Sequence, residues 1–256
     1  MNVSANDILD CLTTMADPGQ TRQLMRFFKT GKGDYGEGDR FMGLRVPQTR
    51  AVVREAAHRV SLPEIEKLLY SPWHEARLAG FLLLEAEMKA ALPGRRKGIP
   101  ADTPQKAARR DAIARFFLRH ARQANNWDLV DIPCRGILGE WLMHPGADGN
   151  LPSRDILDRL ALSDNLWEQR IAIVTTWRFI RERQFADTLR LATLLLGHPH
   201  DLIHKAVGWM LREVGKKDEG VLLDYLEEHH AAMSRTTLRY AIERLPHPLR
   251  LAWLRH

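Results

Sequence analysis

One short motif decides the fold of this chain, and its copies read Arg170-Ile171-Ala172, Lys205-Ala206-Val207 and Arg239-Tyr240-Ala241. Each copy is a basic residue followed by two small or apolar residues, and the copies lie 35 and 34 residues apart. That period is typical of solenoids made from helix pairs, in which each pair buries its apolar face against its neighbours. Earlier copies begin at Arg50 and Arg77. The motif predicts an all-α chain of stacked helical repeats.

Apolar residues recur at helical spacing along almost the whole sequence, and the alternation typical of strands is nearly absent. We expect helices near 5–16, 20–29, 47–59, 62–70, 74–91, 105–123, 133–143, 152–162, 165–181, 184–196, 201–214, 218–228, 234–244 and 246–254. Asp201 is expected to be the N-cap of its helix, and Gly215 to end it. Glycine and proline predict loops at about 31–43 and 92–103.

The positive charge of the chain is concentrated in one segment. The formal net charge is +6, but residues 92–123 alone hold nine basic residues against two acids. Such a patch favours a polyanionic partner: nucleic acid, an acidic protein or an anionic membrane. No stretch approaches the about 20 apolar residues of a membrane span, and the N-terminus lacks the order of a signal peptide, so we expect a cytoplasmic protein.

Two sets of basic residues could form the polyanion-binding surface. At 100° per residue, Arg115, Arg119 and Arg122 share one helix face, opposite the apolar residues Ile113 and Phe117. The repeated motif adds a row on one wall of the solenoid, made of Arg50, Arg77, Arg170, Lys205 and Arg239. The alternative for both sets is an ordinary solvated helix face.

An acid interrupts this row, because the equivalent position between Arg77 and Arg170 falls at about Asp131. A carboxylate among phosphate-binding groups either pairs with an arginine or serves a cation formed in the bound substrate. Trp127 lies four residues earlier, on the same face if that turn is helical. Pro133 disfavours helix at the residue before it, so Asp131 could instead cap a helix that begins near Pro133. Trp209 and Arg170 occupy comparable repeat positions, so all four side chains could converge.

Four segments together resemble the AlkD-like family of bacterial DNA alkylation repair proteins, which are built from HEAT-like repeats. They are Phe41 to Arg50, Asn126 to Asp131, Ser163 to Arg170, and Lys205 to Glu213, and the resemblance covers about residues 20–250. It implies one HEAT-like repeat domain over residues 1–256, C-shaped with a basic concave face. It also implies a DNA glycosylase, a hydrolase of N-glycosyl bonds that starts base excision repair of cationic purines such as 3-methyladenine and 7-methylguanine.

The resemblance assigns roles by position. Trp127 and Trp209 match tryptophans that pack on the backbone and sugar of the damaged nucleotide, Asp131 matches the catalytic carboxylate, and Arg170 matches an arginine that contacts a phosphate. Arg212, in the last segment, joins the candidate DNA-binding residues. The partner would be double-stranded DNA with alkylated bases, bound by a monomer near the bacterial nucleoid, without metal or cofactor. Asn126 departs from the pattern, which has a second tryptophan there.

Other interpretations stay open on the sequence. Trp127 and Trp209 could be core residues, and Arg170 could pair with an acid. The second function is a non-catalytic DNA-binding protein for damaged or branched DNA, and the third is a protein scaffold like other helical solenoids. His198, His200 and His204 suggest a metal site only weakly, because no carboxylate or cysteine pattern completes it.

Overall fold

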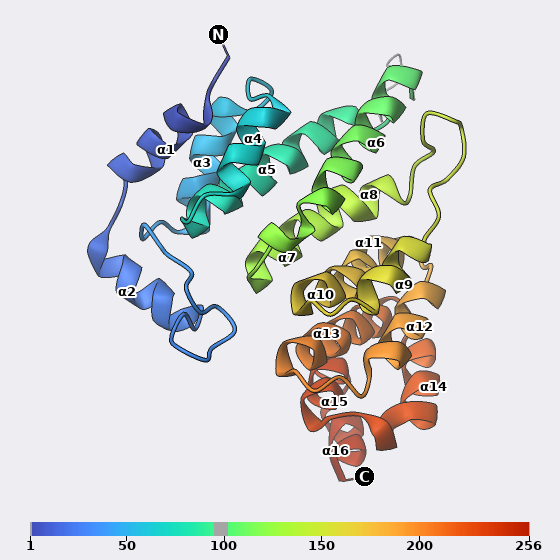
Figure 1. Ribbon diagram of the computed structural model, residues 1–256. Helices are drawn as coiled ribbons and strands as arrows, with labels where there is room; N and C mark the ends of the chain where they lie inside the picture. Colours follow the sequence, from blue (N-terminus) through green and yellow to red (C-terminus); the bar gives the residue numbers. More distant parts are fainter. Residues whose placement is uncertain (1, 95–101, 256) are drawn as a thin grey trace. The chain divides into compact units, whose positions relative to one another are not determined.

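The prediction of an all-α chain is confirmed (Figure 1). The computed structural model describes residues 2–94 and 102–255, and within these the elements are helices, with one isolated bridge between Arg40 and Trp73. The chain divides into two compact units, Met1–Asn150 and Leu151–His256, and each is described by itself. The expected single domain, its C-shape and its concave face stay predictions.

The helices of the first unit begin with α1 at Ala5. They are α1 (Ala5–Thr14), α2 (Pro18–Phe27), α3 (Val46–Ala56), α4 (Leu62–Leu69), α5 (His74–Ala91), α6 (Pro104–Arg119), the 3-10 turn η1 (Ala121–Gln123), α7 (Trp127–Pro133), the π-helical segment η2 (Cys134–Leu138) and α8 (Gly139–Trp141). Helix α5 is the core of this unit and packs against α3, α4, α6 and α7. Its run from Ala76 to Leu84 is buried throughout because it is apolar on almost every side.

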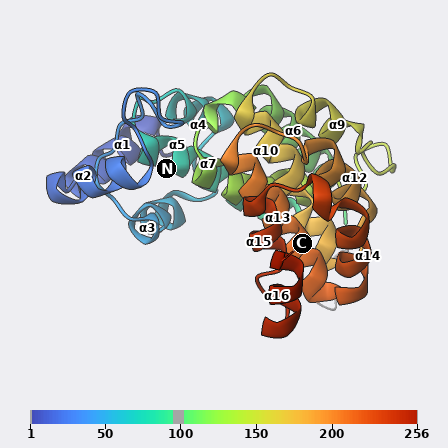
Figure 2. The same ribbon diagram turned by 90° about the horizontal axis from the view of Figure 1, so that it is seen from below.

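The second unit is also helical. It contains α9 (Asp155–Ala161), α10 (Leu166–Thr175), α11 (Trp177–Arg181), α12 (Ala186–Leu195), α13 (Asp201–Lys217), α14 (Glu219–His229), the 3-10 turn η3 (His230–Ala232), α15 (Arg235–Ala241) and α16 (His247–Arg255). Helices α13 and α15 lie side by side in both views (Figure 1 and Figure 2). Gly208 makes this possible, because a Cβ there would lie 2.5 Å from the Thr237 carbonyl oxygen.

Several predicted helix ends differ from the structure. The helix expected over 105–123 ends at Arg119, and residues 121–123 form the turn η1. The helix expected over 133–143 begins at Trp127 and continues through Pro133, after which the turn widens into η2. A proline inside a helix removes one hydrogen bond and crowds the preceding turn, so a wider turn accommodates it. Helix α13 is capped by His200 instead of Asp201, and it continues past Gly215 to Lys217.

The expected loop at 31–43 is confirmed as irregular backbone. The loop at 92–103 is irregular at 92–94 and 102–103, and its residues 95–101 lie outside the described residues, with Arg95, Arg96 and Lys97 of the basic segment among them. None of the helices in the described part of the chain is long and apolar enough to cross a membrane.

Candidate functional site

Trp127 and Asp131 lie on α7, one turn apart and so on the same face of the helix. Both side chains are half-buried. Asn126 is the N-cap, and its Oδ1 accepts the Trp127 N–H at 2.9 Å. The alternative in which Asp131 caps a helix starting near Pro133 is therefore wrong, because Asp131 lies inside a helix that another residue caps.

The indole of Trp127 is held by two phenylalanines at the end of α2. It stacks on Phe28 at 5.1 Å between centroids and 19° between planes, and it meets the edge of Phe27 at 5.8 Å. Phe28 is buried, whereas Phe27 is 63% exposed. Such pairs fix the ring plane as well as burying area. Trp127 therefore presents a defined, partly exposed indole beside the aspartate.

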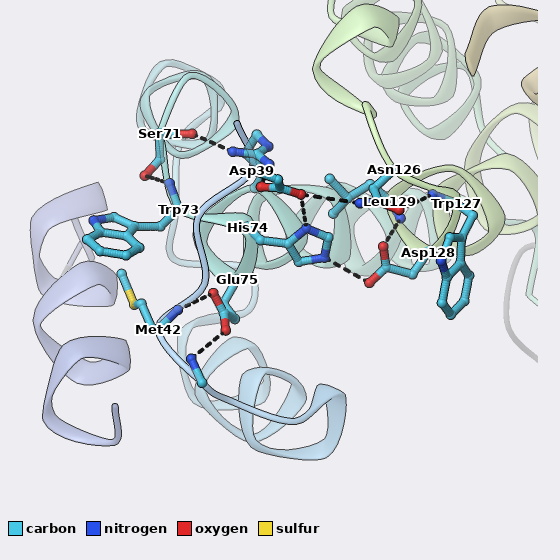
Figure 3. Close-up of polar contacts among 12 residues, drawn as sticks. Asp39, Met42, Ser71, Trp73, His74, Glu75, Asn126, Trp127, Asp128 and Leu129 are labelled. Atoms are coloured by element: carbon cyan, nitrogen blue, oxygen red, sulfur yellow. Dashed lines mark hydrogen bonds and ion pairs between the residues drawn. The ribbon is translucent and has the colours of Figure 1, made fainter. Parts of the chain in front are cut away.

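A buried polar network lies beside the start of α7 (Figure 3). His74, at the start of α5, contacts Asp39 through Nδ1 at 2.7 Å and Asp128 through Nε2 at 2.9 Å. Arg77 donates to Asp39 at 2.5 Å and to the Ser71 carbonyl at 2.8 Å. Asn126 Nδ2 donates to Asp39 at 3.3 Å. We call these residues the His74 network: Asp39, His74, Arg77, Asn126 and Asp128.

Charge inside this network is set by its partners. Burial by itself lowers the pKa of His74, but the charge and hydrogen bond of Asp128, followed by those of Asp39, raise it to about 9. For Asp39, burial raises the pKa, whereas His74 and then Arg77 lower it further than burial raises it. His74 is therefore an imidazolium at neutral pH, between the carboxyl groups of Asp39 and Asp128.

The loop that brings Asp39 to this place is fixed by backbone contacts. Glu75 accepts the N–H groups of Met42, Gly43 and Leu44 at 2.9 to 3.1 Å. Gly36 leaves no room for a side chain, because a Cβ there would lie 2.5 Å from the Phe28 carbonyl oxygen. The sequence reasoning missed the His74 network. The available signal was the group His74, Glu75 and Arg77 directly before the apolar run Leu78 to Leu84.

Two further residues to which the resemblance assigns roles, Trp209 and Arg170, belong to the second unit. Trp209 is half-buried on α13. Arg170, on α10, is only 5% exposed, and its Nη1 donates to the Leu202 carbonyl in the first turn of α13 at 2.7 Å. A phosphate contact by Arg170 would need that side chain to rearrange.

The basic residues differ in their surroundings. Arg115 and Arg119 are exposed and Ile113 and Phe117 are buried, as the helical spacing predicts. Arg122 is also exposed, but it lies in η1, because the helix expected over 105–123 ends at Arg119. Arg77 is a correction, because it is 5% exposed and bound to Asp39, so it does not belong to a surface row. Arg110 of the basic segment is fully buried against Asp102.

Three of the four remaining candidates for DNA binding lie near acids. Arg50 is exposed, 3.8 Å from Glu85, and Lys205 lies 2.8 Å from Asp201. Arg212 pairs with Glu243. Arg239 is exposed. These contacts leave their predicted role untested.

The three histidines before and within α13 bind protein groups. His198 contacts the Gln169 amide oxygen at 2.9 Å, and His204 contacts the His198 carbonyl at 2.5 Å. His200 Nδ1 accepts the Leu202 N–H at 3.1 Å. Within residues 2–94 and 102–255, no group of three or more His, Cys, Asp or Glu side chains could hold a metal ion.

The fold places this chain in the class of all-α proteins of the helical-repeat type. The family model described as DNA alkylation repair enzyme matches residues 8–245, and the chain belongs to this family. The protein is therefore an enzyme of DNA alkylation repair that interacts with DNA.

A solved structure described as a predicted DNA alkylation repair enzyme from Enterococcus faecalis has a similar fold. Its TM-score is 0.61 at 15% identity, over 91% of this chain and 97% of that chain. No curated protein matches the chain.

Proposed function

We propose that the protein is a DNA glycosylase that excises cationic N-alkylated purines, such as 3-methyladenine and 7-methylguanine, from duplex DNA. The observation that carries this proposal is the pairing of Trp127 and Asp131 on one face of α7. Both are half-buried, and Asp131 is not the helix cap. A carboxylate beside a fixed indole can stabilise a cationic centre in the bound substrate.

The reaction needs little besides electrostatic stabilisation. An N-alkylated purine carries a positive charge, so cleavage of its C1′–N bond releases a neutral base and leaves the charge on the sugar. The Asp131 carboxylate stabilises this oxocarbenium-like sugar. It also orients a water molecule, whose oxygen bonds to C1′ while one of its protons passes to the surrounding solvent. The face of Trp127 adds attraction for the cationic sugar.

Trp209 and Arg170 keep the roles that the resemblance assigns, as the second tryptophan and the phosphate-binding arginine. The exposed stripe of Arg115, Arg119 and Arg122 is proposed to bind backbone phosphates. We also propose that the protein works as a monomer in the bacterial cytoplasm.

Substitution of Asp131 tests the chemistry. Asp131→Asn keeps the size of the side chain but removes its charge, so the single-turnover release of 7-methylguanine from methylated duplex DNA should fall by about 10² to 10³, with little change in binding. The matched control is Asp224→Asn, because Asp224 is an exposed acid on α14. Equal rates for wild type and Asp131→Asn would contradict the assignment.

The second function, a non-catalytic DNA-binding protein, is a distinct outcome of the same experiment. It predicts no base release by the wild type, together with salt-dependent binding. In that case Arg119→Ala should reduce the salt slope of binding by about one unit, since one phosphate contact is lost.

A further inference from the structure

We propose that His74 is a positioning residue, which as a buried cation joins Asp39 to Asp128 and thereby fixes the start of α7 and the orientation of Trp127 and Asp131. The inference about α7 stands on the first unit alone. Its consequence for catalysis rests on the proposed function.

The imidazole of His74 contacts two carboxyl groups at once. Both ring nitrogens of His74 face carboxylate oxygens, at 2.7 Å for Asp39 and 2.9 Å for Asp128. A neutral imidazole has one N–H and can donate to only one of them, so two acceptors require the doubly protonated ring. The side chains of His74, Asp39 and Asp128 are 2%, 1% and 6% exposed, so water cannot replace either contact.

The His74 network joins three separate segments of the chain. Asp39 comes from the loop after α2, His74 from the start of α5, and Asp128 from the second residue of α7. Asn126 adds a further link, since its side chain both donates to Asp39 and accepts the Trp127 N–H. The residues on both sides of Trp127 are therefore tied to one buried cation, as Figure 3 shows.

Aromatic rings also connect His74 to Trp127. The His74 ring stacks on Phe41 at 4.3 Å and lies 5.0 Å from Phe28. Phe28 also stacks on Trp127. Movement of His74 would therefore reach Trp127 by two routes, a polar one through Asp128 and an aromatic one through Phe28.

The charge of His74 decides the electrostatic balance of the network. The charged groups that face His74 are Asp39 from the loop, Asp128 from α7 and, on its own helix, Arg77, which binds Asp39. With His74 protonated, the four groups balance. Loss of the proton leaves one uncompensated buried negative charge and one lost hydrogen bond at the start of α7. Since the pKa of His74 is raised to about 9, α7 should loosen as the pH rises through that value.

The test compares His74→Gln with His120→Gln. His120 is a matched control, because it is also buried and bound to a carboxylate, Glu66 at 2.8 Å, but touches neither Asp39 nor Asp128. With methylated DNA, His74→Gln should lower kcat about 10- to 100-fold, as expected when reacting groups are misplaced by about 1 Å. The Kd for DNA should change less than about 2-fold, and the control should keep its kcat. Equal kcat values for the two variants would overturn the proposal.

A second measurement needs neither DNA nor activity. Hydrogen exchange of the Leu129 to Asp131 amides, corrected for intrinsic rates, reports how firmly α7 is held. Protection in the wild type should fall between pH 8 and 10, and in His74→Gln it should be low at every pH. Constant protection in the wild type over that range would overturn the inference. This measurement needs only the wild type, so it holds even if His74→Gln does not fold. If no base is released by the wild type but exchange behaves as expected, the proposed function fails and the positioning role stands.

Discussion

Helices α7 and α13 each carry a predicted site tryptophan, and each begins beside a histidine, yet the two histidines are in opposite states. At α7, His74 lies between two carboxylates and its pKa is raised to about 9. At α13, burial and then neighbouring positive charges lower the pKa of His200 despite the adjacent Asp201. His200 Nδ1 accepts the Leu202 N–H, which only an unprotonated nitrogen can do.

The difference shows that the partners, and not burial alone, decide the charge of a histidine. Carboxylate acceptors on both sides stabilise the imidazolium, whereas a backbone donor at Nδ1 and nearby cations favour the neutral ring. The start of α7 should therefore be sensitive to alkaline pH, and the start of α13 to acidic pH.

The largest expected effect is at the His74 network. The pKa of His74 in the folded protein, about 9, lies above the ordinary value of 6.5. The stabilisation that protonated His74 provides is therefore complete below pH 6.5 and is lost as the pH rises through 9. We expect a loss of about 3 kcal/mol in the free energy of unfolding of the first unit between pH 6.5 and 10. Urea unfolding at a series of pH values measures it, with His74→Gln as the reference that lacks this dependence. Parallel curves for the two proteins would contradict the charged state of His74.

A smaller effect is expected from the close packing of α13 against α15 at Gly208. Gly208→Ala forces a methyl group against the Thr237 carbonyl and the Tyr240 Cβ, each 2.5 Å away, so α15 must move. The cost should be about 2 kcal/mol at every pH. The control is Gly220→Ala on α14, where the nearest atom is at 3.5 Å and the helix should gain stability from the alanine. Equal midpoints of thermal unfolding for the two variants would show that the close approach is not needed.

The smallest effect is the cap of α13. His200→Ala removes the acceptor for the Leu202 N–H and should cost about 1 kcal/mol at pH 8. Because the folded pKa of His200 lies below 6.5, the wild type loses this advantage as the pH falls below 6.5. The stability difference between the two proteins should therefore shrink as the pH is lowered below 6.5. A difference that does not shrink would mean that another group caps the helix.

The sequence predicts the helices well because burial of one apolar face imposes a period that is visible locally. It fails where the decisive partner is distant. Arg77 looks like a surface arginine until Asp39, 38 residues away, is brought against it. Asn126 looks like a weakened site residue, whereas its amide joins the cap of α7 to Asp39.

The pairing of Trp127 and Asp131 was predictable from their spacing, but the helix that carries them was not. Pro133 is a normal sign of a helix boundary, and here the backbone continues through it by widening the next turn. The helical wheel of α6 predicts that Arg115 and Arg119 are exposed and that Arg110, on the same face as Ile113 and Phe117, is buried. It does not show that Asp102 binds the buried Arg110, and it does not apply to Arg122, which lies beyond the end of α6 in η1.

The π-helical segment η2 also affects how this chain is compared with its relatives. A π turn holds one residue more than an α turn, so the residues after it are rotated by about 100° relative to an uninterrupted helix. A relative with a regular helix here would be one residue shorter between Pro133 and Trp141. An alignment without a gap in that interval would therefore pair residues on different helix faces, and the gap belongs within Cys134–Leu138.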